Sequence, residues 1–201
     1  MLQSIVALIE NCPDGIINIK RSLQMIIERT NIFCQMLHIA KIHFKRENCG
    51  KVIFLDFDGV LATEEYTESL LLSGKKTKDK FGTLFDPNCI ESFNWIISQT
   101  NAKIVITSSW KNYLSLLSII RMWRYRKMSG MVIGVTPSIS VYRGEEIDKW
   151  LSKHIGINNY VIIDDMDNRQ FRKEHHSHLV TTNHFSGLDS SSAQEAIRLL
   201  I

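Results

Sequence analysis

The sequence of 201 residues predicts an α/β fold built on a doubly wound parallel sheet. Three short, continuously apolar runs, at 51–55, 102–106 and 160–163, have the composition of parallel strands that are buried on both faces. Helical patterns at 87–98 and 145–154 separate these runs along the chain. Weaker strand patterns lie at 131–134 and 179–182. Strands that alternate with helices form a parallel sheet, in which ligands bind at the carboxyl ends of the strands.

The N-terminal segment, residues 1–44, has apolar side chains at helical spacing and a Pro-Asp-Gly break at 13–15, so we expect two helices there. Their apolar faces need a cover, which either the rest of the chain or a second chain supplies. The second possibility predicts a homo-oligomer through residues 1–44. The polar stretch 45–50 then resets the pattern, and we expect a helical extension over 1–48 and an α/β domain over 49–201.

Composition and charge narrow the class of protein. With 44% apolar and 22% charged residues the chain is typical of globular proteins, and its formal charge of +3 is too small to bind nucleic acid through bulk charge. Charged residues interrupt the apolar N-terminal runs, so neither a membrane span nor a membrane partner is expected, and the pattern of a secretory signal is missing. We therefore expect a cytoplasmic protein. Its four cysteines, which form no C-x-x-C pair, are expected to be reduced: Cys12, Cys34, Cys49 and Cys89.

Two carboxylates follow the first predicted strand, one residue apart, and a glycine comes next. Strand alternation sends Asp56 and Asp58 to the same side, and Gly59 allows a sharp turn after them. Two crowded carboxylates repel each other unless a cation lies between them, which implies Mg²⁺ bound by oxygen ligands. The string Asp56-Phe57-Asp58-Gly59-Val60 resembles the first motif, D-x-D-G-hydrophobic, of the haloacid dehalogenase (HAD) superfamily.

The second strand run ends in hydroxyl residues, which resemble the second motif of that superfamily. A Thr or Ser at this place hydrogen-bonds phosphoryl oxygens in the superfamily, which implies Thr107. Ser108 is the alternative, because the strand end can lie one residue further on. A Thr-Ser-Ser cluster also suits a helix N-cap, and we expect Ser109 to take that role.

The third and fourth motifs supply a cation and a pair of acids. A cation is expected at the start of the helix that precedes the last catalytic strand, and Arg143 has that position, with Lys149 as the alternative. The strand run at 160–163 ends in Asp164 and Asp165. Adjacent acids at the end of an apolar strand are costly unless they bind cations, and the resemblance makes Asp164 a direct metal ligand and Asp165 a second ligand or a water holder.

The resemblance implies a Rossmann-like, HAD-like fold over roughly residues 51 to 187 and a Mg²⁺-dependent phosphomonoesterase. In that chemistry the nucleophile is Asp56 and the proton shuttle is Asp58. The transferring group is held by Thr107 and Arg143, with Gly59, Ser108 and Lys149 as further substrate contacts. The magnesium ligands are Asp56, Asp58, Asp164 and Asp165.

A narrower resemblance points to the HAD phosphatase domains of bacterial and phage RNA-repair proteins. Ser-Ser-Trp-Lys at 108–111, Val-Ile-Gly-Val-Thr-Pro at 132–137 and the Arg-Gly-Glu-Glu-Ile string at 143–147 carry it. It implies a terminal phosphate on RNA or DNA as the substrate. Members of that subgroup more often have Arg where Lys111 stands. A small phosphate ester as substrate, or a non-catalytic module that binds phosphorylated ligands, are the alternatives.

Features outside the four motifs carry weaker expectations. Roughly 40 residues between the first and second motifs leave room for little or no cap, so the site should be open, and the basic loop at 75–80 should be solvated. The histidine-rich tract at 174–178 is also expected to be a solvated loop. Trp110 and Trp150 should pack in the core, while the cluster at 122–127 is the better candidate contact surface.

Overall fold

The computed structural model describes residues 16–45 and 49–201, and the chain divides into two compact units between Ala40 and Lys41. Helix α2 (Ile16–Lys45) is the second of the two helices expected at the N-terminus; the first falls outside the described residues. Large apolar side chains of α2, such as Ile26 and Phe33, are exposed. The predicted oligomer through residues 1–44 stays a prediction. Among the helices of the described residues, none is long and apolar enough to span a membrane.

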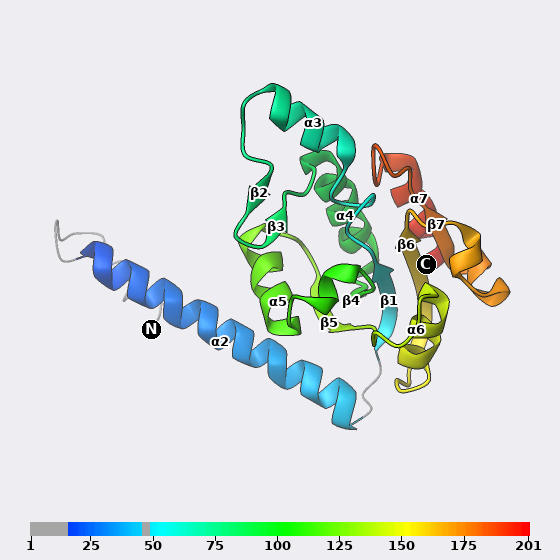
Figure 1. Cartoon of the computed structure of the whole chain (residues 1–201). Coiled ribbons are helices and arrows are strands. Elements are labelled where there is room, and N and C mark those ends of the chain that lie inside the picture. The colour runs from blue at the N-terminus through cyan, green and yellow to red at the C-terminus, as the bar shows by residue number, and fades with distance from the viewer. Residues whose placement is uncertain (1–15, 46–48) are drawn as a thin grey trace. The chain divides into compact units, whose positions relative to one another are not determined.

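The second unit contains the predicted parallel sheet (Figure 1). Its described strands are β1 (Gly50–Leu55), β4 (Lys103–Ile106), β5 (Met131–Val135), β6 (Ile157–Asp164) and β7 (Leu179–Thr181). They lie in the order β5-β4-β1-β6-β7, and every neighbouring pair is parallel. The chain builds outward from β1 to β4 and β5, then crosses back to β6 and β7, so the winding reverses between β1 and β6. In such sheets the ligand site lies at the carboxyl ends of the strands at this reversal.

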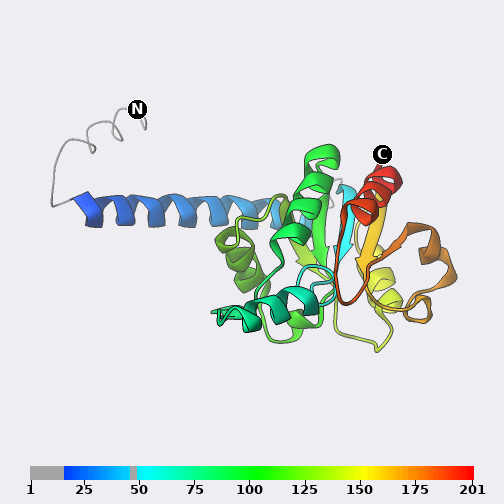
Figure 2. The same cartoon turned by 90° about the horizontal axis from the view of Figure 1, so that it is seen from above.

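Helices cover both faces of the sheet, which confirms the doubly wound prediction. The described α-helices of this unit are α3 (Glu64–Leu72), α4 (Pro87–Thr100), α5 (Leu116–Tyr125), α6 (Arg143–Leu151) and α7 (Ser190–Leu200). A Cβ at Gly130 would contact both Ile97 of α4 and Ile104 of β4, so α4 lies on the face of the sheet that carries the Ile104 side chain. The Trp150 ring of α6 lies 5.4 Å from the Phe54 ring of β1, so α6 lies on the face that carries Phe54. Ile104 pairs with Ile53, whose side chain is on the opposite face from its neighbour Phe54, so α4 and α6 lie on opposite faces. Helix α7 lies beside α4 (Figure 2).

The insertion between the first two motifs is small. It consists of α3 and a hairpin of two short strands, β2 (Lys78–Asp79) and β3 (Gly82–Thr83), before α4 begins. The hairpin is fastened to α5, because Arg126 donates hydrogen bonds to both carboxylate oxygens of Asp79 at 2.9 and 3.1 Å. As expected, the described chain has no large cap here, and the lysines of the basic loop are exposed.

Two expectations about surface segments were wrong in part, because each segment combines exposed residues with buried ones. The tract at 174–178 lies in a short 3₁₀ helix, η3 (Lys173–His178), and His175 is 2% exposed with its Nε2 2.9 Å from Asp148 Oδ1. The cluster at 122–127 is not a contact surface as a whole, since Met122 and Trp123 are buried in the core. The apolar spacing of α5 explains the latter, because it turns these two side chains inward. The prediction that Trp110 and Trp150 pack in the core is confirmed, with each 3% exposed.

Candidate active site

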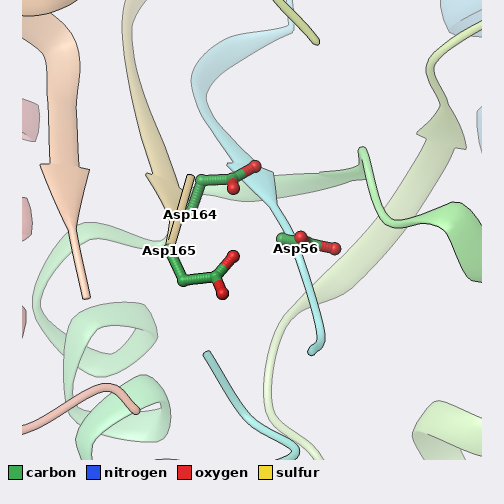
Figure 3. A group of neighbouring side chains, drawn as sticks. All are labelled: Asp56, Asp164 and Asp165. Atoms are coloured by element: carbon green, nitrogen blue, oxygen red, sulfur yellow. The ribbon is translucent and has the colours of Figure 1, made fainter. Parts of the chain in front are cut away.

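Three carboxylates meet where the winding of the sheet reverses (Figure 3). Asp56 follows β1 directly, Asp164 is the last residue of β6, and Asp165 comes next. Parallel pairing of Leu55 with Ile163 places these strand ends side by side. Each of the three offers an oxygen within 4.8 Å of the others, and among the described residues this is the acidic group that could hold a metal ion.

Among the described residues, the three carboxylates of this cluster outnumber the two side chains that pair with them as cations, Arg143 and His184. Burial, and then the nearby Asp56 carboxylate, raise the pKa of Asp164 to about 7, although the guanidinium of Arg143 opposes the shift. Asp164 is fully buried, and its Oδ2 accepts no hydrogen bond within the described part of the chain. A divalent cation bound by carboxylate oxygens would satisfy this atom and offset the repulsion. The residues present therefore fit Mg²⁺.

Arg143, the first residue of α6, reaches two of the three carboxylates. Its Nη2 lies 3.3 Å from Asp56 Oδ2 and its Nη1 lies 3.3 Å from Asp164 Oδ2, and the side chain is buried. Lys149, the alternative on the same helix, is exposed and makes neither contact. Burial lowers the pKa of the Arg143 guanidinium, but the charges of Asp56 and Asp164 outweigh this effect. The pKa of Arg143 is therefore raised above its usual value. The structure thus places Arg143, and not Lys149, beside the predicted nucleophile.

Thr107 and Ser108 are both buried, but their hydroxyls have different surroundings. Ser108 is the N-cap of the 3₁₀ helix η1 (Ser109–Asn112), and its Oγ accepts a hydrogen bond from Trp110 N at 3.4 Å. The expectation that Ser109 caps this helix was wrong, because the chain turns one residue earlier. Thr107 N donates to Leu55 O at 2.9 Å, and Thr107 Oγ1 has no hydrogen-bond partner among the described residues. Of the two hydroxyls, that of Thr107 is therefore the one whose hydrogen-bonding capacity is wholly unused among the described residues.

Lys111 holds the second motif against α6, a role that the sequence did not reveal. Its Nζ donates to Thr107 O at 2.9 Å, to Thr136 Oγ1 at 3.0 Å and to Glu146 Oε2 at 2.5 Å. The side chains of Lys111 and Glu146 are 5% and 7% exposed, so the ion pair is buried. Burial lowers the pKa of Lys111, and Glu146 opposes that shift. The sequence does not show which face of α6 packs against the second motif, so it could not identify Glu146 as the partner of Lys111.

Asp58 lies apart from the three-carboxylate cluster. Its Oδ2 accepts a hydrogen bond from Trp110 Nε1 at 2.9 Å, and the residue lines an open pocket of about 490 Å³ together with Thr63 and Glu64. Burial raises the pKa of Asp58, the charges of Asp56 and Asp165 act in the same direction, and the Trp110 hydrogen bond opposes them. A raised pKa keeps the proton on a carboxyl that is to act as a general acid.

His184, in the loop after β7, is a further residue that the sequence analysis missed. It hydrogen-bonds Asp165 Oδ2 through Nδ1, and its Nε2 lies 3.2 Å from Glu64 Oε1 at the start of α3. The hydrogen bond with Asp165 raises the pKa of His184, and Glu64 adds to the effect. No motif marks this position, because the contact depends on how the loop folds back over β6.

Gly59 lies against Asp165 with a left-handed φ of +68°. A Cβ at this position would be 2.8 Å from Asp165 Cβ and closer still to its carboxylate. We expect Gly59→Ala to displace Asp165 and to weaken Mg²⁺ binding by roughly 10- to 100-fold, the usual effect of disturbing the support of a metal ligand. Calorimetric titration with Mg²⁺, or the dependence of activity on Mg²⁺ concentration, measures this affinity. The matched control is Gly74→Ala, because Gly74 also has a positive φ, +64°, but has open space around it. Equal Mg²⁺ affinity in both variants would contradict the expectation.

Part of the chain matches a known protein family. A family model described as the HAD domain in Swiss Army Knife RNA repair proteins matches residues 52–193. The curated proteins and the solved structures contain no match to this chain.

Proposed function

Because this chain belongs to the family of HAD domains in Swiss Army Knife RNA repair proteins, we propose that it is a Mg²⁺-dependent phosphomonoesterase that acts through an aspartyl-phosphate on Asp56. The observation that carries the proposal is the meeting of Asp56, Asp164 and Asp165 with the buried Arg143 at the strand ends. Carboxylates alone would repel a phosphate ester, whereas this set includes a guanidinium and the oxygen ligands for a divalent cation.

The residues divide the reaction into two displacements. The Asp56 carboxylate attacks phosphorus, the ester P–O bond breaks, and its electron pair leaves on the alcohol oxygen, which takes a proton from Asp58. Asp58 then removes a proton from water, which attacks the aspartyl-phosphate and releases inorganic phosphate with Asp56 restored. The Thr107 hydroxyl, which has no partner in the described part of the chain, and the Arg143 guanidinium bind the phosphoryl oxygens. Bound Mg²⁺ on Asp56, Asp164 and Asp165 would offset the charge of the transferring group.

For the substrate we propose a terminal phosphate on RNA or DNA. The family occurs in RNA-repair proteins, and the small insertion over the site leaves room for a polynucleotide end. The exposed lysines of the basic loop and hairpin, at 75–80, are suited to contact a phosphate backbone.

Removal of the metal should abolish phosphate release. The assay measures inorganic phosphate from p-nitrophenyl phosphate, from 3′- and 5′-phosphorylated oligonucleotides and from nucleoside monophosphates, first with EDTA and then with Mg²⁺ restored. We expect activity only with Mg²⁺ and a higher kcat/KM on oligonucleotide ends than on nucleotides.

Three other patterns of activity would change the proposal. A preference for nucleotides would replace the polynucleotide substrate with a small phosphate ester but keep the mechanism. Activity that survives EDTA would contradict the metal dependence. Release from none of these phosphates, with Mg²⁺ present, would favour a module that binds phosphorylated ligands without turning them over.

A further inference from the structure

A tryptophan from the second motif is bonded to the carboxyl group from the first. Trp110 and Asp58 are 52 residues apart in the chain, and the indole Nε1 donates to Asp58 Oδ2 at 2.9 Å. An indole N–H is a donor only, so Oδ2 is held as an acceptor. The proton of a neutral Asp58 carboxyl must then lie on Oδ1, and Asp58 lines the pocket where a leaving group would sit.

The indole is held in place by rings on several sides. Trp110 is 3% exposed, and its ring centroid lies 5.4 Å from that of Phe57 and 6.0 Å from that of Phe85. The guanidinium of Arg126 lies 4.1 Å from the Phe85 ring and 5.7 Å from the Trp110 ring. Packing of this kind leaves a large side chain few other rotamers.

The β2–β3 hairpin also lies against the indole. A Cβ added to Gly82 would be 3.0 Å from Trp110 Cη2, so the hairpin backbone lies directly on the ring. The same hairpin is fastened by the hydrogen bonds from Arg126 to Asp79. The position of the Asp58 carboxyl thus depends on a packed unit that includes the insertion over the site.

We propose that Trp110 is a positioning residue for the proton transfer: its N–H fixes the Asp58 carboxyl so that Oδ1 delivers the proton to the leaving oxygen. This inference rests on the proposed function and assigns to Trp110 a role that differs from base stacking or plain core packing. Loss of this hydrogen bond should lower kcat/KM most for esters whose leaving oxygen must be protonated as it departs. It should matter little for an ester whose leaving group departs readily as an anion.

The test is Trp110→Phe, which keeps an aromatic ring and removes the N–H. We expect kcat/KM for phenyl phosphate to fall roughly 10- to 100-fold, a part of what general acid catalysis contributes, and kcat/KM for p-nitrophenyl phosphate to change by less than about threefold. The two substrates have nearly the same shape, so a purely structural defect would lower both equally. Asp58→Asn should show the same selective loss.

Trp150→Phe is the matched control. Trp150 is also 3% exposed, and its Nε1 has no hydrogen-bond partner among the described residues, so its replacement should leave the ratio of the two kcat/KM values unchanged. Independently of activity, Asp58→Ala should shift the indole N–H resonance of Trp110 in ¹⁵N-¹H spectra more than that of Trp150.

The outcomes distinguish the two proposals. Equal losses on both aryl phosphates, or no loss, in Trp110→Phe would overturn the positioning role and leave the phosphatase proposal intact. A Trp110 resonance that does not respond to Asp58→Ala would also overturn it. A wild-type protein that releases phosphate from neither aryl ester nor from oligonucleotides would overturn the proposed function and the positioning role with it.

Discussion

Asp56→Asn should lower phosphate release by roughly 10⁴-fold or more, because an uncharged amide cannot act as the nucleophile and loss of an essential nucleophile costs rates of this order. The substitution keeps the size of the side chain. It also removes one of the charges that raise the pKa of Asp164, so the melting temperature without Mg²⁺ should not fall. Phosphate release and thermal unfolding of the same samples measure both effects.

A matched carboxylate serves as the control for this variant. Asp167 lies three residues beyond Asp164 and pairs only with Arg169 among the described residues, so Asp167→Asn should keep full activity. A covalent phosphate on the peptide that contains Asp56, trapped by acid during turnover of the wild type, would support the proposed intermediate. If Asp56→Asn kept activity within tenfold of the wild type, Asp56 would not be the nucleophile.

Lys111→Met should destabilise the fold by about 3 to 5 kcal/mol, because it leaves the buried Glu146 carboxylate without its cation. The Thr107 carbonyl and the Thr136 hydroxyl lose a donor as well. Urea unfolding measures the free energy of unfolding. If the unpaired charge is the cause, Lys111→Met combined with Glu146→Leu should recover part of the loss.

Lys149→Met is the control for this stability prediction. Lys149 is exposed on the helix that carries Glu146, and a surface change of this kind is usually within about 0.5 kcal/mol of neutral. A Lys111→Met variant as stable as the Lys149 variant would mean that the ion pair contributes no net stability. It would also remove the argument that Lys111 anchors the second motif.

Strands β1, β4 and β6 could be predicted because each contains a short apolar run that is buried on both faces. Strand β1 is the clearest case, since Val52 to Leu55 are all buried. Three helices were not predicted. Helix α3 buries Leu70 alone, so it has no strong apolar stripe. Helix α7 begins with serines, and its buried face consists mainly of small residues such as Ala193 and Ala196, which are weak evidence for a buried helix. The apolar residues of α5 are interrupted by Arg and Tyr, which favoured a surface interpretation.

The site residues also fall into a group that the sequence predicts and a group that it does not. Asp56, Asp164 and Arg143 could be predicted to meet because they follow or begin elements whose ends a parallel sheet brings together. The contacts of Lys111 with Glu146, and of His184 with Asp165, join side chains that are 35 and 19 residues apart. They depend on rotamers and on the path of loops, for which apolar periodicity carries no information.

In the proposed mechanism, the small insertion also influences which acceptor reaches the phosphorylated Asp56 carboxylate. Helix α3 and the β2–β3 hairpin are all that the chain adds between the first two motifs, and Asp58 stays exposed beside them. Bulk water therefore competes for the phosphoryl group at a concentration that no dissolved alcohol can match. Such a site favours release of the phosphate over its transfer to a second hydroxyl, and the phosphorylated form of the protein should be short-lived.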